Sequence, residues 1–407
     1  MTFNGENIRE DFPLLSRKVY SKELIYLDSA ATSQKPVQVL EAMDRAYRCF
    51  NANVHRGVHF LSEEMTEMYE NSRKQVASYI GAASKEEIIF SSGATASLNM
   101  VARSWCEKTL RKGDNVVVSR MEHHSNIVPW QIECLRYGAE LRVLEIDRNG
   151  EILYDMLDSV VDQRTRVVAI TEQSNTLSTE PDLRRIIAKA HQMGAVVVVD
   201  GCQGVVHLPV DVVAEDYDFY AFSAHKLYGP LGLGVLYGKK ALLEDMPVCF
   251  SGGEMVDHVS FEKTTFAPLP LRFEAGTPNF IGAYALASAL DYLSKFDKES
   301  IASYECSLTD YLISTLERED GVTIYGKSKS RGPIVSFNVE GCDHYDLGVI
   351  LDKMGVAIRT GHHCAEPVMD FFGVHGMCRA SLAMYSTKND IDAFGVALHR
   401  AISMLRR

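Results

Sequence analysis

Two residues of this chain have the types and placement that chemistry on an amino acid's α-carbon requires. Lys226 stands in the string Phe-Ser-Ala-His-Lys-Leu-Tyr-Gly-Pro, and Asp200 ends an apolar strand of four valines. A lysine that forms a Schiff base with pyridoxal phosphate needs a carboxylate at the ring nitrogen, because a protonated ring draws electrons from the substrate. The carboxyl ends of strands in an open α/β sheet are where ligands gather, and both residues fall there. The pair therefore predicts pyridoxal phosphate as the cofactor.

A phosphate site is expected where the strand at 88–91 leads through a glycine turn into a helix that starts near Ala94 and Thr95. The first backbone N–H groups of a helix have no partner within it, and the helix dipole favours an anion there. Thr95 would add a hydroxyl, and Ser223 and His225, just before the lysine, could close the cradle from the other side. The alternative is that Thr95 only neighbours a helix cap and binds nothing.

His123 follows the strand at 115–119, within Met-Glu-His-His-Ser-Asn, and should reach the same edge of the sheet. An imidazole there can stack on a pyridine ring and pass protons near neutral pH. A lone histidine is more often structural. The convergence of Thr95, His123 and the lysine–aspartate pair from separate strand ends favours the functional interpretation.

The string Arg-Thr-Gly-His-His-Cys-Ala at 359–365 predicts a nucleophile at Cys364. A cysteine attacks as its thiolate, and a glycine loop carrying Arg359 and two histidines can favour the thiolate and let it move. Metal binding is the competing idea, but adjacent ligands on one strand point to opposite faces, so we expect no metal. Arg379 is a candidate for bidentate capture of an amino acid's α-carboxylate, or else a surface ion pair.

Composition limits the partners. A net charge of -12 disfavours binding to nucleic acid, since a phosphate backbone attracts clustered Lys and Arg. Residues 1–9 are polar, unlike a signal peptide, and no apolar run is long enough for a membrane span. Nine scattered cysteines fit free thiols in a reducing compartment. We expect a cytoplasmic protein that binds neither nucleic acid nor membrane.

Strand-like and helical stretches alternate through the first 240 residues, which is typical of an α/β fold with a mainly parallel sheet. The predicted strands are 88–91, 115–119, 141–144, 167–171, 196–200 and 218–222. Long loops are expected at 251–279, followed by a helix at 281–296.

A smaller α+β unit should follow, with strands at 334–339 and 356–359, a helix at 345–354 and a last helix from about 390. We predict a large cofactor-binding domain at 22–290 and a small C-terminal domain at 291–407. Residues 1–21 should pack on the small domain.

Several of these strings resemble those of the group II, SufS-like cysteine desulfurases and selenocysteine lyases of the class V aminotransferase family. They are the lysine, histidine and cysteine strings above, with Leu-Asp-Ser-Ala-Ala at 27–31, His-Arg-Gly-Val-His at 55–59 and Phe-Glu-Ala-Gly-Thr-Pro-Asn at 273–279. The resemblance covers nearly the whole chain. It implies fold type I with a seven-stranded type of sheet, a homodimer, and pyridoxal phosphate on Lys226.

The resemblance also implies roles for individual residues. Asp200 would meet the ring nitrogen, Gln203 the ring hydroxyl, and His123 would stack on the ring. The implied phosphate ligands are Ala94, Thr95, Ser223, His225, and Thr277 of the other subunit. Asn175 and Arg379 match the positions that recognise the substrate carboxylate, and Arg359 lies near the nucleophile.

The implied reaction converts L-cysteine to L-alanine and leaves sulfur as a persulfide on Cys364, for an acceptor protein or small molecule. The alternatives are selenocysteine lysis on L-selenocysteine, another reaction on the same cofactor, or a sulfur-relay homologue without catalysis. The chain departs from the family pattern at Ala94, Ala96, Glu172, Ser178 and Leu231. These departures leave open a specialised biosynthetic sulfur donor beside general iron–sulfur cluster assembly.

Overall fold

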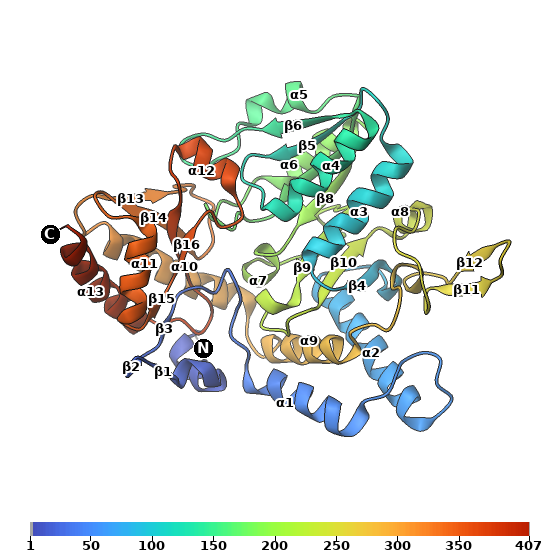
Figure 1. Ribbon diagram of the computed structural model, residues 1–407, viewed down its shortest axis with the longest axis horizontal. Helices are drawn as coiled ribbons and strands as arrows, with labels where there is room; N and C mark the ends of the chain where they lie inside the picture. The colour runs from blue at the N-terminus through green and yellow to red at the C-terminus, as the bar shows by residue number, and fades with distance from the viewer. Residues whose placement is uncertain (1–2, 407) are drawn as a thin grey trace.

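The computed structural model describes residues 3–406, and a seven-stranded sheet lies at its centre (Figure 1). The strand order is β4-β10-β9-β8-β7-β5-β6. Neighbours from β6 to β9 pair in parallel, whereas β10 runs antiparallel to both β9 and β4. The strands are β4 Ile88–Ser91, β5 Asn115–Ser119, β6 Glu140–Leu144, β7 Thr165–Thr171, β8 Val196–Asp200, β9 Phe219–Ser223 and β10 Gly234–Gly238. The predicted α/β fold with a mainly parallel sheet is confirmed.

The predicted strands agree with the observed ones to within two residues, but β10 was missed. Glycine at both ends of Gly234–Gly238 weakens the strand pattern in the sequence. The first of these glycines has a packing role, because a Cβ at Gly234 would lie 2.4 Å from the Cα of Gly93. Close contact between these two backbones fixes the turn that leads into α3, Ala94–Thr109.

Apolar side chains cover both faces of the sheet. Val197 and Val199 of β8 belong to one buried cluster, and Val198 between them belongs to the cluster on the opposite face. Alternation of this kind follows from the two-residue period of a strand. The helices of this unit are α1 Val37–Arg45, α2 Phe60–Tyr79, α3 Ala94–Thr109, α4 Val128–Tyr137, α5 Leu157–Val160, α6 Leu183–Gln192, α7 Gly204–His207, α8 Lys240–Asp245 and α9 Phe280–Leu293.

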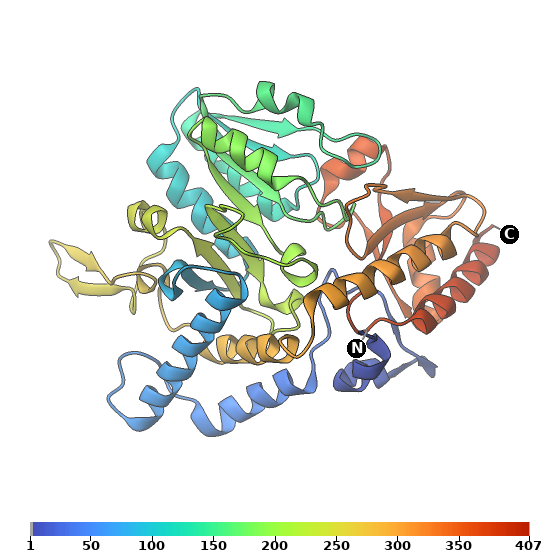
Figure 2. The ribbon, with the colours of Figure 1, turned by 180° about the vertical axis from the view of Figure 1, so that it is seen from behind.

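A second, smaller sheet lies beside the first (Figure 2). Its order is β13-β14-β17-β16, and all its pairs are antiparallel. Its strands are β13 Val322–Tyr325, β14 Ile334–Val339, β16 Arg359–Gly361 and β17 Met377–Ser381. Its helices are α10 Lys298–Leu316, α11 His344–Lys353, α12 Glu366–Phe372 and α13 Lys388–Leu405.

The strand expected at 356–359 is divided into two. Val356–Ala357 forms β15, which pairs in parallel with β3 at Ile25–Tyr26, whereas Arg359 begins β16 in the small sheet. The sequence pattern could not show this, because the break at Ile358 depends on an N-terminal partner more than 300 positions away. The division places Arg359 and the segment that follows it at the edge of the small sheet.

We predicted long loops at 251–279, but this stretch is not loop throughout. It contains a hairpin of β11 Val256–Val259 and β12 Thr264–Phe266, which projects from the body of the molecule (Figure 1). The remaining segment ends in the loop that carries Thr277. A buried ion pair anchors this loop, because Glu274 accepts hydrogen bonds from Arg73 of α2, from Tyr69, and from the backbone N of Phe90 in β4.

The N-terminal segment packs against both units. Arg9 pairs with Asp390 of α13 at 2.9 Å, and Phe12 contacts the rings of Tyr228, Tyr292 and Tyr385. A further short hairpin joins β1 Lys18–Val19 to β2 Lys22–Glu23. Residues 1 and 2 of the predicted 1–21 segment lie outside the described residues. The division of the chain into domains at residue 290 stays a prediction.

None of the helices within residues 3–406 has the length and apolarity to cross a bilayer.

Candidate active site

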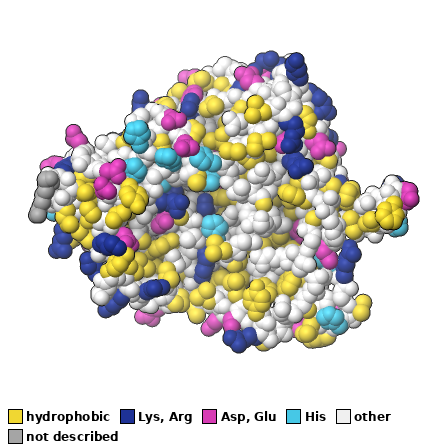
Figure 3. All heavy atoms as spheres, viewed as in Figure 1, with side chains coloured by type: hydrophobic (Ala, Val, Ile, Leu, Met, Phe, Trp, Pro, Cys, Tyr) yellow, Lys and Arg dark blue, Asp and Glu magenta, His cyan; other side chains and the backbone are white. Residues whose placement is uncertain are grey.

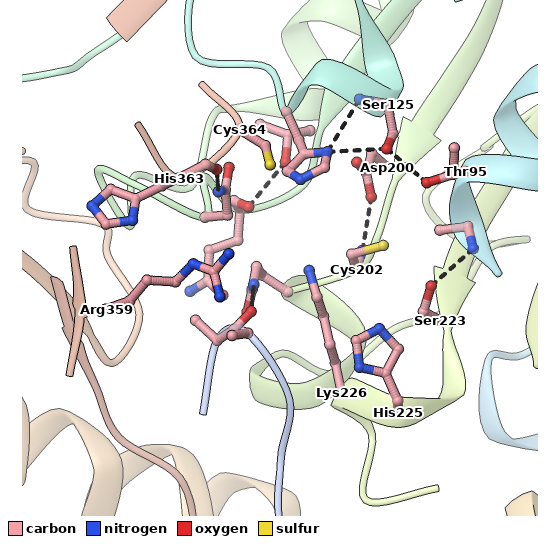
Figure 4. A pocket seen from close by; sticks show the side chains of 18 of the residues that line it. Thr95, Ser125, Asp200, Cys202, Ser223, His225, Lys226, Arg359, His363 and Cys364 are labelled. Atoms are coloured by element: carbon pink, nitrogen blue, oxygen red, sulfur yellow. Dashed lines mark hydrogen bonds between the residues drawn. The ribbon is translucent and has the colours of Figure 1, made fainter. Parts of the chain in front are cut away.

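A cavity open to solvent lies at the carboxyl ends of the parallel strands (Figure 4). Both sheets contribute to its wall. The lining residues are Ala30, Ala31, Ala94, Thr95, His123, Ser125, Thr171, Gln173, Asn175, Asp200, Cys202, Gln203, Ser223, His225, Lys226, Arg359, His363, Cys364 and Arg379.

Asp200 is buried at the last position of β8. Two hydrogen bonds hold the turn that follows it. The backbone N of Cys202 donates to Oδ1 of Asp200 at 3.0 Å, which fixes the carboxylate against the turn. Gln203 donates from Nε2 to the carbonyl of Ala30 at 2.9 Å. The carboxylate therefore has a fixed direction at the base of the cavity.

Lys226 is the third residue after β9 and extends its amine into the cavity (Figure 4). Beside it, Nδ1 of His225 is buried without a hydrogen-bond partner among the described residues. Burial, with help from the charges of Lys226 and Lys35, lowers the pKa of His225 to about 4. His225 is therefore neutral near pH 7 and can donate to an oxygen anion from one nitrogen.

Lys35 stabilises this turn from behind, because its Nζ donates to the carbonyl of His225 at 2.7 Å. Burial lowers the pKa of Lys35 to about 7.

The turn between β4 and α3 faces Lys226 from the other side. Thr95 is exposed at the start of α3, and its hydroxyl lies 2.7 Å from that of Ser125. The backbone N of Ala94 donates to Oγ of Ser223 at 2.8 Å (Figure 4). Ala94 and Ser223 thus join the two sides of the expected phosphate cradle directly.

His123 lies on the cavity wall with a defined orientation. Its Nδ1 accepts from the backbone N of Ser125 at 3.1 Å. Burial and the charge of Lys226 lower the pKa of His123 to about 4, so this imidazole is neutral over the range in which we expected it to titrate. The single N–H of the neutral ring is therefore on Nε2, because Nδ1 accepts the hydrogen bond from Ser125.

The residue before it, Glu122, is fully buried and anchors the same loop. It accepts from Ser119 at 2.5 Å, Asn126 at 2.7 Å and the backbone N of Thr171 at 3.0 Å. Burial raises the pKa of Glu122 to about 8.

Cys364 reaches the cavity from the segment between β16 and α12 and is exposed to solvent. His363 and Cys364 have φ of 53° and 54°, in the left-handed region, so the loop is tightly turned at the nucleophile. The backbone N of His124 donates to the carbonyl of Cys364 at 2.7 Å, which ties the loop to the large sheet.

The two histidines of this loop differ. His363 is buried, and burial together with Arg379 lowers its pKa to about 2, so it brings no positive charge to the thiol. His362 instead lies at the surface, where its Nδ1 is 3.1 Å from Oε1 of Glu366.

The expected carboxylate-binding residues lie at the junction of the two sheets. Arg379 is buried in β17 and donates from Nη1 to the carbonyl of Asn175 at 2.9 Å. Asn175 donates in turn from Nδ2 to the carbonyl of His363 at 2.8 Å. Nε of Arg379 is buried with no partner among the described residues, which leaves a donor for a ligand.

Thr277 is the one predicted site residue that lies apart. It lines a second cavity, together with Ala96 and Ser92, and not the cavity of Lys226.

Sequence reasoning missed other residues at the site. Ala30, Ser125 and Lys35 were not singled out, and neither was Asp28, which pairs with Arg379. Asp28 and Ala30 fall in the Leu-Asp-Ser-Ala-Ala string, but nothing near them in sequence indicates their partners.

Comparison with known proteins identifies the family of this chain. The family model described as aminotransferase class-V matches residues 25–394. The chain therefore belongs to the class-V aminotransferase family. It is 49% identical over 406 residues to a protein named cysteine desulfurase from Escherichia coli strain SE11, with full coverage of both chains. The family to which the sequence was expected to belong is confirmed.

Solved structures give the same answer for this class-V chain. It is similar to the cysteine desulfurase CsdA of Escherichia coli in its S-sulfonic acid form, with a TM-score of 0.93, 39% identity and full coverage of both chains. It is also similar to an apo cysteine desulfurase from Thermococcus onnurineus NA1, with a TM-score of 0.93, 36% identity and 98% coverage of both chains.

One departure from the family pattern has a clear structural setting. Glu172 follows β7 and is buried, and its carboxyl group accepts from Tyr217 at 3.0 Å and Tyr220 at 2.5 Å. A Cβ at Gly204 would lie 1.9 Å from its Oε2, so Glu172 packs tightly against the segment after Asp200. Burial raises the pKa of Glu172 from 4.5 to about 7, although both tyrosines oppose the shift.

Replacing Glu172 should change how stability depends on pH. Between pH 4.5 and 7 the unfolded chain ionises this carboxyl while the folded chain keeps it protonated, so the wild-type free energy of unfolding falls as pH rises. Glu172→Gln should remove that fall, which amounts to no more than about 3.4 kcal/mol. Urea denaturation at pH 5, 6, 7 and 8 measures it, with the exposed Glu41→Gln as control. Parallel pH profiles for wild type and Glu172→Gln would contradict this assignment.

Proposed function

We propose that this chain is a pyridoxal-phosphate-dependent cysteine desulfurase, which converts L-cysteine to L-alanine and holds the sulfur as a persulfide on Cys364. One observation carries the proposal: Lys226, Asp200 and Cys364 line the same cavity. The cysteine desulfurases to which the chain is similar support it, among them the Escherichia coli structure in its S-sulfonic acid form. Aminotransfer alone would leave a thiol at this place without a role.

Residues on the cavity wall suit the cofactor. Pyridoxal phosphate, when bound, withdraws electrons from the α-carbon of an amino acid attached to it. Lys226 would hold it covalently, Asp200 would face its ring nitrogen, and Gln203 its ring hydroxyl. Its phosphate would be held by Thr95, Ser223 and His225, near the backbone of Ala94. The unpartnered Nδ1 of His225 fits this role, because a phosphate oxygen would satisfy a buried polar atom.

Substrate would be held by its carboxylate. Arg379 offers its free Nε, and Arg359 lies at the mouth of the cavity with about half of its side chain exposed. Asn175 would act mainly by orienting Arg379 and the cysteine loop, because its carbonyl and its side-chain amide already bond to them. The neutral His123 would stack on the ring and donate from Nε2.

The chain's own residues then divide the chemistry. The amine of Lys226 would remove the α-proton of the substrate. The thiolate of Cys364 would attack the substrate's sulfur, so that a sulfur–sulfur bond forms as the carbon–sulfur bond breaks. The bonding electrons stay with the carbon, which takes up a proton to become the methyl group of alanine. Cysteine and a protein thiol thus give alanine and a protein persulfide, with no external oxidant or reductant.

Loss of the thiol should abolish sulfur abstraction but spare the cofactor site. Cys364→Ala should form alanine from L-cysteine at least about 100-fold more slowly than wild type, because the nucleophile is gone. Its visible absorbance from bound cofactor should be unchanged. Cys306→Ala, at another exposed cysteine outside the cavity, is the matched control. Full alanine production by Cys364→Ala would overturn the nucleophile assignment.

The proposal extends to a homodimer in which Thr277 serves the partner's cofactor site. Several large apolar side chains are exposed at the surface: Val58 is 96% exposed, Phe60 73% and Phe261 109%. Phe261 lies at the tip of the β11–β12 hairpin, where apolar side chains gather (Figure 3). Exposed patches of this kind mark protein interfaces. The second cavity, with Thr277 and Ala96, opens beside the turn at Ser92 that begins the phosphate cradle.

Mixing two variants that are impaired in different ways tests the shared site. Lys226→Ala lacks the covalent anchor, and Thr277→Ala should bind cofactor about tenfold more weakly, since a hydrogen bond to a charged group is lost. In a mixed dimer, the Lys226 of one chain and the Thr277 of the other complete one intact site. Unfolding and refolding the two together should therefore restore turnover at limiting cofactor. If Thr277 serves its own chain, the mixture will show no gain over the separate variants.

The proposal includes an acceptor for the sulfur and a cytoplasmic location. The exposed thiol of Cys364 suits transfer to a thiol of another protein or of a small molecule. All nine cysteines are free, which fits a reducing compartment.

A further inference from the structure

Asp28 lies between the two arginines of the candidate substrate site. Its Oδ1 is 3.3 Å from Nη2 of Arg379, and its Oδ2 is 4.0 Å from Nη1 of Arg359. One carboxylate therefore faces two guanidinium groups from two strands of the small sheet, β16 and β17. Asp28 does not line the cavity itself and acts on it only through the arginines.

The backbone fixes Asp28 in this position. Asp28 pairs with Ser381 in an isolated parallel β-bridge. The backbone N of Ser381 also donates to the carbonyl of Leu27, the residue before Asp28, at 2.8 Å. The hydroxyl of Tyr26 donates to the carbonyl of Asp28 at 3.3 Å and to that of Thr32 at 2.8 Å. The carboxylate is thus part of the scaffold and not a mobile surface group.

The two arginines differ in their need for a counter-ion. Arg379 is 2% exposed, and a buried cation is costly unless it is paired, so Asp28 compensates this charge. The side chain of Arg359 is 47% exposed and is well solvated without help. Together the three groups carry one net positive charge, which matches one substrate carboxylate.

We propose that Asp28 is a specificity-determining positioning residue, which cancels one guanidinium charge so that the site prefers amino acids with one carboxylate over those with a second anionic group. Two uncompensated guanidinium groups would favour the binding of a dicarboxylic amino acid, because each could pair with one carboxylate. The inference rests on the proposed function, in which Arg379 receives the substrate's α-carboxylate.

The experiment compares two sulfur-free amino acids that differ by one carboxylate. L-alanine and L-aspartate are titrated into the holoenzyme at pH 8, and binding is followed by the change in cofactor absorbance. Asp28→Asn should improve the affinity for L-aspartate relative to L-alanine by about tenfold, which is the size expected for removing one charge near the second carboxylate. Asp28→Glu keeps the charge and should keep the wild-type ratio. Asp44→Asn removes an exposed charge elsewhere and is the matched control.

A purely structural role for Asp28 predicts a different result. Asp28→Asn would then weaken both amino acids equally and leave their ratio unchanged, and this outcome would overturn the proposal. Should Asp28→Asn fail to fold, Arg359→Gln gives an independent reading from an exposed side chain. It should weaken L-aspartate more than L-alanine, and equal losses would again contradict the proposal. Because the titration requires no turnover of cysteine, failure of the desulfurase proposal would appear separately, as absent alanine production by the wild type.

Discussion

The parallel order of β7, β8 and β9 is the constraint on which the rest of the site depends. Strands that run side by side in the same direction end at the same edge, so Asp200 and the turn carrying Lys226 meet there although they come from different strands. Apolar packing on both faces of the sheet holds that edge rigid. A buried carboxylate can then face an amine across a cavity without the two groups collapsing into an ion pair.

The small sheet completes the site by contributing two arginines and the cysteine nucleophile. Arg359, Arg379 and Cys364 all come from β16, β17 and the loop between them. The side-chain amide of Asn175 and the backbone N of His124 donate to carbonyls of that loop and so join it to the large sheet. The cofactor machinery and the nucleophile thus belong to separate sheets. Hydrogen bonds across the junction and one shared apolar cluster set their relative position.

The sequence predicted the parts of the site that depend on local pattern. Asp200 ends an apolar strand, and Lys226 and His123 each come shortly after one. These strand ends were recognisable because four valines or a similar apolar run precede them. The division of 356–361 between two sheets, the pairing of Asp28 with Arg379 and the neutral state of His363 were not predictable, because each depends on contacts between residues far apart in the chain. Thr277 was placed only through the family resemblance, and its role stays a prediction.

The fate of the sulfur atom tests the central claim most directly. The holoenzyme is mixed with one equivalent of L-cysteine per subunit in the absence of reductant, and both the alanine formed and the mass of each cysteine-containing peptide are measured. We predict one alanine per subunit and a gain of about 32 Da, one sulfur atom, on the peptide that contains Cys364. Alanine formed with no added mass on that peptide, or with the sulfur on another of the nine cysteines, would contradict the assignment of Cys364 as the sulfur acceptor.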